Sequence, residues 1–221
     1  MVTPGTAPAA VLWSGGKDST LALQRALGDG VRVTTLFNLY DEASARVRFH
    51  GVRRELIQAQ ADALGLDLIQ CGTAPDTFEA VFQAGLAELV RRGVNTLVLG
   101  NIHLADVRAW YEERTAAAGL AHVEPLWGWR PDRVVDEFVR AGYRARITGV
   151  DTSVAPTRWL GHDIDAGLIT EFRAAGIDVA GERGEYHSFV HDGPRFTRPI
   201  AIRNGAIRDE TTHAFMDVQG V

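Results

Sequence analysis

The segment that decides the fold is Ser14-Gly15-Gly16-Lys17-Asp18-Ser19, which lies between a short apolar run at residues 9–13 and an apolar periodic segment at residues 20–27. A strand, a glycine turn and a helix in this order predict a tight loop whose backbone can approach a ligand. The first N–H groups of a helix lack internal partners and carry partial positive charge, so an anion is the usual ligand there. The serine hydroxyls add donors, and the lysine adds a full positive charge.

The alternative interpretation is a plain strand-to-helix turn in which Asp18 or Ser19 caps the helix. Lys17 favours the anion site, because it is the only lysine among the 23 Lys and Arg residues of the chain. A compact ammonium at a glycine turn suits a phosphate as a point charge, where a bulky guanidinium fits less well. The loop has neither the Walker spacing nor the Gly-x-Gly-x-x-Gly spacing.

Composition limits the classes of function. The chain has 221 residues, a hydrophobic fraction of 46% and a formal net charge of −5, which fit an α/β domain with a smaller appended lobe. The acidic balance argues against a broad nucleic-acid surface. Cys71 is the only cysteine, so no internal disulfide or Cys-x-x-Cys pair can form. Residues 1–8 lack the regions of a signal peptide, and no long apolar run suggests a membrane span, so we expect a loose tail and a cytoplasmic protein.

Apolar runs alternate with helical periodicity through the first 130 residues, which predicts βαβ units and a doubly wound, mostly parallel sheet. The expected strands are 9–13, 31–39, 66–71, 96–100 and 122–126, and the expected helices are 20–27, 52–64, 78–92 and 105–118. Ligands of such sheets bind at the carboxyl ends of the strands. We therefore expect the glycine loop, Asn38, the polar segment 40–50, Cys71-Gly72 and Gly100–His103 around one cleft.

The pattern changes after Trp129, and we predict a first domain at 1–130, which carries the glycine loop, and a smaller α+β lobe at 131–221. Expected elements are a helix at 131–141, a strand at 145–150, a loop at 152–162, a helix at 163–175 and a charged glycine-rich loop at 181–187. Asn204-Gly205 between apolar alternation predicts a hairpin turn.

The glycine loop resembles the PP-loop of the N-type ATP pyrophosphatases, which cleave ATP between the α and β phosphates. Three further segments resemble the diphthine–ammonia ligase branch of that superfamily: Gly100-Asn101-Ile102-His103 with Asp106-Val107-Arg108, Glu124-Pro125-Leu126-Trp127, and Gly181-Glu182-Arg183-Gly184-Glu185-Tyr186-His187-Ser188. The four matches span residues 14 to 188 in order. Asn101 stands where an aspartate is usual, which puts a metal or base role there in doubt, and Ser188 stands where a threonine is usual.

The resemblance implies a fold of the HUP/PP-loop type and an AMP-forming amide ligase. ATP would activate a carboxylate as an acyl-adenylate with release of pyrophosphate, and ammonia would then displace AMP. ATP and Mg²⁺ are the implied cofactors, and Asp18 is the best protein ligand for the metal, although a helix cap explains it equally well.

Residue roles follow from the same resemblance. The catalytic candidates are Lys17, Asp18, Glu182 and Glu185. The nucleotide candidates are Ser14, Gly15, Gly16, Lys17, Asp18, Ser19, Asn38 and Gly100. The substrate candidates are His50, Asn101, His103, Arg108, Tyr186, His187 and Ser188. For Glu182 and Glu185 the alternative is a solvated charged loop, and for Arg108 it is a surface ion pair. A zinc site from His50, His103 and His187 lacks ligand spacing.

The acceptor is left open. A diphthine-bearing elongation factor is expected if the source is archaeal or eukaryotic, and another carboxylate if it is bacterial, as the replacement of lysine by arginine suggests. A PP-loop enzyme acting on tRNA and a nucleotide sensor without turnover are the other hypotheses, the second because of Asn101. A homodimer is one assembly consistent with these hypotheses.

Overall fold

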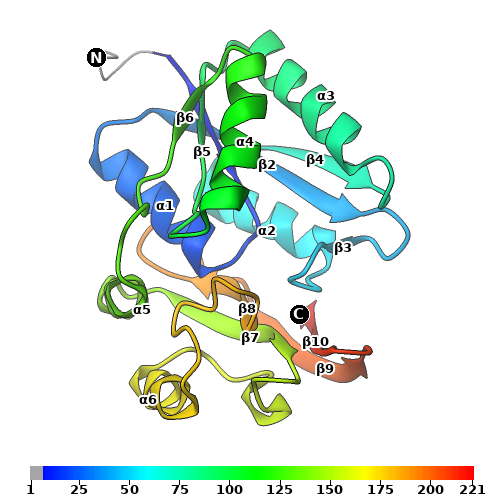
Figure 1. The fold of residues 1–221 in the computed structure, drawn as a ribbon, viewed down its shortest axis with the longest axis vertical. Coiled ribbons are helices and arrows are strands. Elements are labelled where there is room, and N and C mark those ends of the chain that lie inside the picture. The colour runs from blue at the N-terminus through cyan, green and yellow to red at the C-terminus, as the bar shows by residue number, and fades with distance from the viewer. Residues whose placement is uncertain (1–6) are drawn as a thin grey trace.

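The structure is a computed structural model that describes residues 7–221. A mostly parallel sheet with helices on both faces lies beside a smaller antiparallel sheet that carries its own helices (Figure 1). The predicted tail falls largely on residues 1–6, which lie outside the described residues. Within residues 7–221, no helix has both the length and the apolar character needed to cross a bilayer.

The first sheet and its helices occupy the N-terminal part of the chain. Its strands are β1 (Ala9–Leu12), β2 (Val33–Asp41), β3 (Arg46–Val47), β4 (Asp67–Thr73), β5 (Thr96–Val98) and β6 (Ala121–Val123). Its helices are α1 (Lys17–Gly28), α2 (Arg54–Leu64), α3 (Phe78–Arg91) and α4 (Ala105–Ala117).

The parallel strands stand in the order β4-β2-β1-β5-β6, and the short β3 pairs antiparallel with the far end of β2. From β1 the chain winds outward through β2 and β4, and it then returns to β5 on the other side of β1 and continues to β6. The point between β1 and β5 is therefore a topological switch point, where a crevice opens at the carboxyl ends of the strands. The predicted doubly wound α/β fold is confirmed.

Both faces of this sheet are buried, because successive side chains of a strand point to opposite faces. Ala9 and Val11 join one apolar cluster with residues of α1 and α2, and Ala10 joins another with residues of α3. An apolar run without alternation is what a parallel strand covered on two sides requires.

The second sheet follows α5 (Pro131–Arg140) and has the order β8-β7-β10-β9, all antiparallel. Its elements are β7 (Arg144–Asp151), the short 3₁₀ helix η1 (Thr157–Trp159), α6 (Ala166–Ala175), β8 (Tyr186–Asp192), β9 (Ile202–Asp209) and β10 (His213–Gly220). The smaller α+β lobe is thus present, while the domain boundary at residue 130 stays a prediction. One apolar cluster contains Trp13 of the first region and Phe138 and Tyr186 of the second, so the two regions share a core.

The predicted hairpin turn at Asn204-Gly205 is wrong. Both residues lie inside β9, and the chain turns at residues 210–212, where Glu210 N donates to the His213 carbonyl at 2.7 Å. The Asn204 side chain is held across the lobe, since its amide donates to the Gly161 carbonyl at 3.0 Å and its oxygen accepts from Arg146 at 2.6 Å. β9 also passes an irregularity of β10 between Met216 and Val218. Asn204 and Gly205 are therefore part of a strand and not of a turn.

Smaller differences concern the ends of elements. The strand expected at 122–126 ends at Val123, the helix expected from 163 begins at Ala166, and β2 continues to Asp41, so Asn38 is not at its end. Asp165 explains the later helix start, because its carboxylate caps α6 by accepting from Leu168 N at 2.8 Å.

A buried glutamine joins the glycine loop to both sheets. Gln60 of α2 is fully buried, accepts from Trp13 Nε1 at 2.8 Å, and donates to the carbonyls of Gly15 at 2.9 Å and Val190 at 2.6 Å. The Gly15 carbonyl also accepts from Val190 N at 2.9 Å. Strand β8 of the second sheet therefore holds the glycine loop of the first.

We predict that Gln60→Leu lowers the free energy of unfolding by about 2–4 kcal/mol, because it leaves the Trp13 indole N–H and the Val190 carbonyl buried without this partner. Urea denaturation measures the change. Gln58→Leu is the matched control, since Gln58 is an exposed glutamine of the same helix that bonds only to Asp62, and its loss is expected to change stability by no more than about 0.5 kcal/mol. Equal losses for the two variants would contradict the role of Gln60.

Candidate functional site

The glycine loop forms a nest of backbone N–H groups between β1 and α1. Gly15 adopts φ +82°, and a Cβ atom there would lie 2.6 Å from Ile57 Cδ1, so only glycine fits. Helix α1 begins after Gly16 with no side-chain cap, which excludes the alternative that Asp18 or Ser19 caps it. Of the N–H groups in the first turn, that of Lys17 donates to Ser188 Oγ at 3.3 Å, and those that follow it remain available to an anion.

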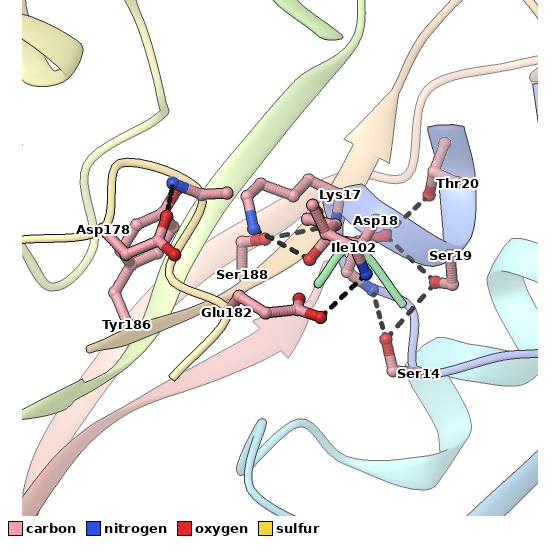
Figure 2. Close-up of polar contacts among 12 residues, drawn as sticks. Ser14, Lys17, Asp18, Ser19, Thr20, Ile102, Asp178, Glu182, Tyr186 and Ser188 are labelled. Atoms are coloured by element: carbon pink, nitrogen blue, oxygen red, sulfur yellow. Dashed lines mark hydrogen bonds and ion pairs between the residues drawn. The ribbon is translucent and has the colours of Figure 1, made fainter. Parts of the chain in front are cut away.

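The serines and Gly100 shape the same turn. Ser19 Oγ donates to the Gly16 carbonyl at 3.1 Å, and the Ser14 and Ser19 hydroxyl oxygens lie 3.3 Å apart (Figure 2). Gly100, two residues after the end of β5, lies against the first turn of α1, because a Cβ there would lie 2.8 Å from the Asp18 carbonyl carbon. Gly100 thus permits the approach of the helix N-terminus to the end of β5.

Lys17 is buried behind the nest instead of projecting into the cavity. Its Nζ donates to Asp18 Oδ2 at 2.8 Å and lies 4.9 Å from the centroid of the Tyr186 ring (Figure 2). Burial by itself lowers the pKa of Lys17, but the attraction of Asp18 and the other acidic groups outweighs it and the pKa lies above its ordinary value. The ammonium is therefore permanently charged, and it lies on the interior side of the glycine loop.

Asp18 has one oxygen in use and one without a partner. Oδ2 accepts from Lys17, while Oδ1 is buried and makes no hydrogen bond. Burial raises the pKa of the Asp18 carboxyl and the Lys17 charge opposes this. No group of three or more His, Cys, Asp or Glu side chains within residues 7–221 is arranged to hold a metal ion. One available carboxylate oxygen fits Mg²⁺, which usually takes few protein ligands beside substrate phosphates and waters.

The two glutamates of the 181–188 segment have different surroundings. Glu182 Oε1 accepts from Ile102 N at 2.8 Å, and its side chain lines the cavity. Burial, with the charge of Asp18, raises the pKa of Glu182 to about 7. Glu185 is buried away from the cavity, where it accepts from Asp178 N at 3.2 Å and from Arg183 N at 3.0 Å. The geometry supports a chemical role for Glu182 and a loop-ordering role for Glu185.

Strand β8 brings Tyr186, His187 and Ser188 against the nest. Ser188 Oγ accepts from Lys17 N at 3.3 Å, and the Ser188 carbonyl accepts from His50 Nδ1 at 3.0 Å. The fully buried Tyr186 donates to the Val179 carbonyl at 2.7 Å, so its ring supports Lys17 and does not face a substrate.

The two histidines beside the nest are neutral at pH 7. Burial lowers the pKa of His50 to about 4, and burial with the neighbouring His50 and Lys17 lowers the pKa of His187 well below its usual value. Their ring centroids are 4.8 Å apart. They can therefore accept or donate hydrogen bonds beside the nest without adding positive charge.

Asn101 has no carboxylate of its own, but its side chain contacts the carboxylate of Glu124. Its amide donates to Glu124 Oε1 at 2.6 Å, and Glu124 is almost completely buried. Arg108 lies 3.4 Å from Glu124 Oε2 and stacks over the Trp127 ring at 4.5 Å. The ion pair expected as the alternative for Arg108 is thus formed, with a buried partner, and the contacts do not direct Arg108 to a phosphate.

The remaining predicted residues lie behind the cavity. His103 Nε2 is 2.7 Å from Asp178 Oδ2. Asn38 is fully buried, where its amide donates to the Trp13 carbonyl at 2.7 Å, so a contact of its backbone with a base stays a prediction. Sequence reasoning missed Gln60 and Asp178, which carry no local motif, and Glu124, which was visible only as part of the Glu-Pro-Leu-Trp match.

These groups surround a cavity of about 240 Å³ at the switch point. One end is polar and the other apolar or aromatic. The polar end is formed by Ser14, Asp18, Ser19, His50, Gly100, Asn101 and Glu182, and the apolar end by Leu12, Trp13, Leu39, Val47, Phe49, Phe78, Leu99 and Tyr111. The guanidinium of Arg48, which also lines the cavity, lies over the rings of Phe49 and Phe78. Such a cavity suits a ligand with an anionic part and a planar apolar part.

We predict that Asn101→Asp destabilises the protein at pH 7 by about 1–3 kcal/mol, because two carboxylates would replace an amide–carboxylate hydrogen bond. Addition of Glu124→Gln is expected to recover most of this loss by reversing donor and acceptor. The Asn101→Asp deficit should shrink toward pH 5, since the carboxylate pair can then share a proton. Urea denaturation measures each variant, with the exposed Asn95→Asp as the matched control. A double variant no more stable than Asn101→Asp alone would contradict the pairing.

Comparison with known proteins agrees with this geometry. The chain is similar to the bovine and human proteins named diphthine–ammonia ligase, at 25% identity in both cases, over 95% of this chain and 88% of each relative. The diphthine–ammonia ligase of the rat is 24% identical over the same shares. Residues 7–122 match the family model described as the diphthamide synthase N-terminal domain, and residues 130–221 match its C-terminal domain. The chain therefore belongs to the diphthamide synthase family.

Proposed function

We propose that this protein is an ATP-dependent, AMP-forming ligase that converts a carboxylate into an amide with ammonia. The names of its relatives support a ligase and ammonia as the nitrogen donor. The observation that carries the proposal is the uncapped start of α1 at the switch point, with a buried, charged lysine behind it and a cavity in front.

The first step uses the nest. An oxygen of the substrate carboxylate attacks the α-phosphorus of ATP, the bond from that phosphorus to the bridging oxygen breaks, and pyrophosphate leaves with the electron pair. The N–H groups of the first turn of α1 and the Lys17 ammonium stabilise the charge that accumulates on the leaving group. Asp18 Oδ1 would hold Mg²⁺, whose chemistry is to neutralise phosphate charge.

The second step uses Glu182. Ammonium must lose a proton before its nitrogen can attack the acyl carbon, and a carboxylate with a pKa of about 7 at the edge of the cavity can take it. Attack breaks the bond to the AMP oxygen, and the second proton of the nitrogen leaves to solvent as the adduct collapses. Glu185 is too deeply engaged with the loop backbone for this exchange.

Diphthine on an elongation factor is the first acceptor to test, because the relatives carry diphthine in their names. The sensor hypothesis loses its main support, since Asn101 forms a complete hydrogen bond to Glu124 instead of leaving a gap in the site. A cytoplasmic location and a homodimer stay predictions.

Incubation of the protein with ATP, Mg²⁺, ammonium and diphthine-bearing elongation factor, or with other carboxylates, is expected to give AMP and pyrophosphate in equal amounts with the amide. Chromatography of the nucleotides and mass spectrometry of the acceptor measure this. Formation of ADP and phosphate would contradict the proposal.

We predict that the ammonia-dependent rate rises as the pH increases through about 7, because Glu182 accepts a proton only when ionised. Glu182→Gln should lower this rate by about 100-fold and remove the inflection near pH 7, so that the residual rate only follows the fraction of free ammonia. Glu185→Gln is the control, and its pH profile should keep the inflection. Acid-dependent exchange of pyrophosphate into ATP, which precedes ammonia, should change little in Glu182→Gln; loss of exchange to the same extent would contradict a role in the second step.

A further inference from the structure

Residues 46–51 form a short loop that makes one wall of the cavity. Val47, Arg48, Phe49 and His50 all line it. The loop closes on itself, since Val47 N donates to the Val52 carbonyl at 2.7 Å and Gly51 N donates to the Val47 carbonyl at 3.0 Å. Its position relative to β1 therefore decides how the apolar end of the cavity is enclosed.

Pairing with β2 and a contact of Gly51 with the Phe215 ring fix part of this loop, but its outer side is only partly packed. Behind it lies a second cavity of about 290 Å³, lined in part by Arg46, Val47, Arg48 and Phe49 themselves. The backbone at the tip is also unfavourable, because Phe49 adopts φ +65° while its side chain is 67% exposed. Such conformations persist only where the surroundings enforce them.

One carboxylate of the other sheet holds both ends of the loop. Asp217 of β10 accepts from Arg46 Nη2 at 2.6 Å and from Arg53 through Nε at 3.0 Å and Nη2 at 2.8 Å. Arg46 links Asp217 to the end of the loop, since its Nη1 donates to the Gly51 carbonyl at 2.7 Å. Gln219 supplies a further donor to Asp217 at 2.7 Å. The carboxylate is thus fully hydrogen-bonded, and its pKa is lowered chiefly by the Arg53 bonds.

Removal of this negative charge would leave arginines facing one another. The pKa of Arg208 in β9 is lowered chiefly by burial and further by the positive charges of Arg46 and Arg53. The three arginines therefore lie close enough to repel one another. The carboxylate nearest to Arg208 is that of Glu210, whose Oε1 lies 3.9 Å from Arg208 Nη1. Without Asp217 the mutual repulsion of these arginines would push the loop outward, away from the nucleotide cavity.

We infer that Asp217 is a positioning residue for nucleotide binding, which closes the 46–51 loop over the apolar end of the cavity through Arg46 and Arg53. The inference rests on the proposed function, in which this cavity holds ATP. Asp217 touches neither nucleotide nor acceptor and acts only through the two arginines.

The test is Asp217→Asn in the full-length protein. Titration calorimetry with α,β-methylene-ATP and Mg²⁺ is expected to show affinity lower by about tenfold. Affinity for inorganic pyrophosphate should change by less than about twofold, because the nest itself is held by α2 and β8. Amide hydrogen exchange of residues 46–52 should become faster in the nucleotide-free protein.

Two further variants make the test decisive. Arg53→Met removes the bidentate partner at a half-exposed side chain and should reproduce the selective loss even if Asp217→Asn folds poorly. Asp163→Asn is the matched control, since Asp163 pairs with Arg144 and Arg146 in the same sheet but does not contact the loop.

The outcomes separate the two claims. Unchanged nucleotide affinity in both Asp217→Asn and Arg53→Met would overturn the inference and leave the proposed function intact. Equal losses for the nucleotide and for pyrophosphate would also overturn it, because they would indicate general damage. Failure of the wild-type protein to bind the nucleotide would overturn both.

Discussion

The hydrogen bonds received by the Gly15 carbonyl are the constraint on which the site depends. The carbonyl of this left-handed glycine points into the interior of the protein, where it needs hydrogen-bond donors. Gln60 and the backbone of Val190 provide this, one from α2 and one from the second sheet. Ser188, two residues earlier on β8, engages the next turn at Lys17 N. The nest is therefore a joint product of both sheets, although every residue that forms it is local in sequence.

The charges around the nest explain why the buried ammonium of Lys17 is stable there. Asp18 neutralises Lys17 directly, while Glu182 is held near half-protonation at neutral pH and the two adjacent histidines are uncharged. These groups together therefore carry little net charge. Groups with shifted pKa values concentrate here because burial and close charges coincide at the same edge of the sheet.

The parallel sheet, the nest and the helices could be predicted because apolar runs, periodicity and glycine turns are local signals. The contacts that complete the site could not, since Gln60, Asp217 and Glu124 act across large sequence separations without a pattern of their own. Glu185 was predicted to be catalytic from its motif, but its carboxylate accepts hydrogen bonds from loop N–H groups. A local motif does not show where a side chain points. Asn204-Gly205 was misjudged because the turn signal ignores the partners that Asn204 finds in Arg146 and Gly161.

The shared core has a consequence for how such a chain can change over time. Because Trp13, Phe138 and Tyr186 belong to one apolar cluster, the C-terminal lobe is not an exchangeable attachment to the N-terminal region. A substitution deep in the antiparallel sheet would disturb the glycine loop through β8. Exposed connections therefore tolerate change most easily, while the cores of the two sheets are obliged to diverge together.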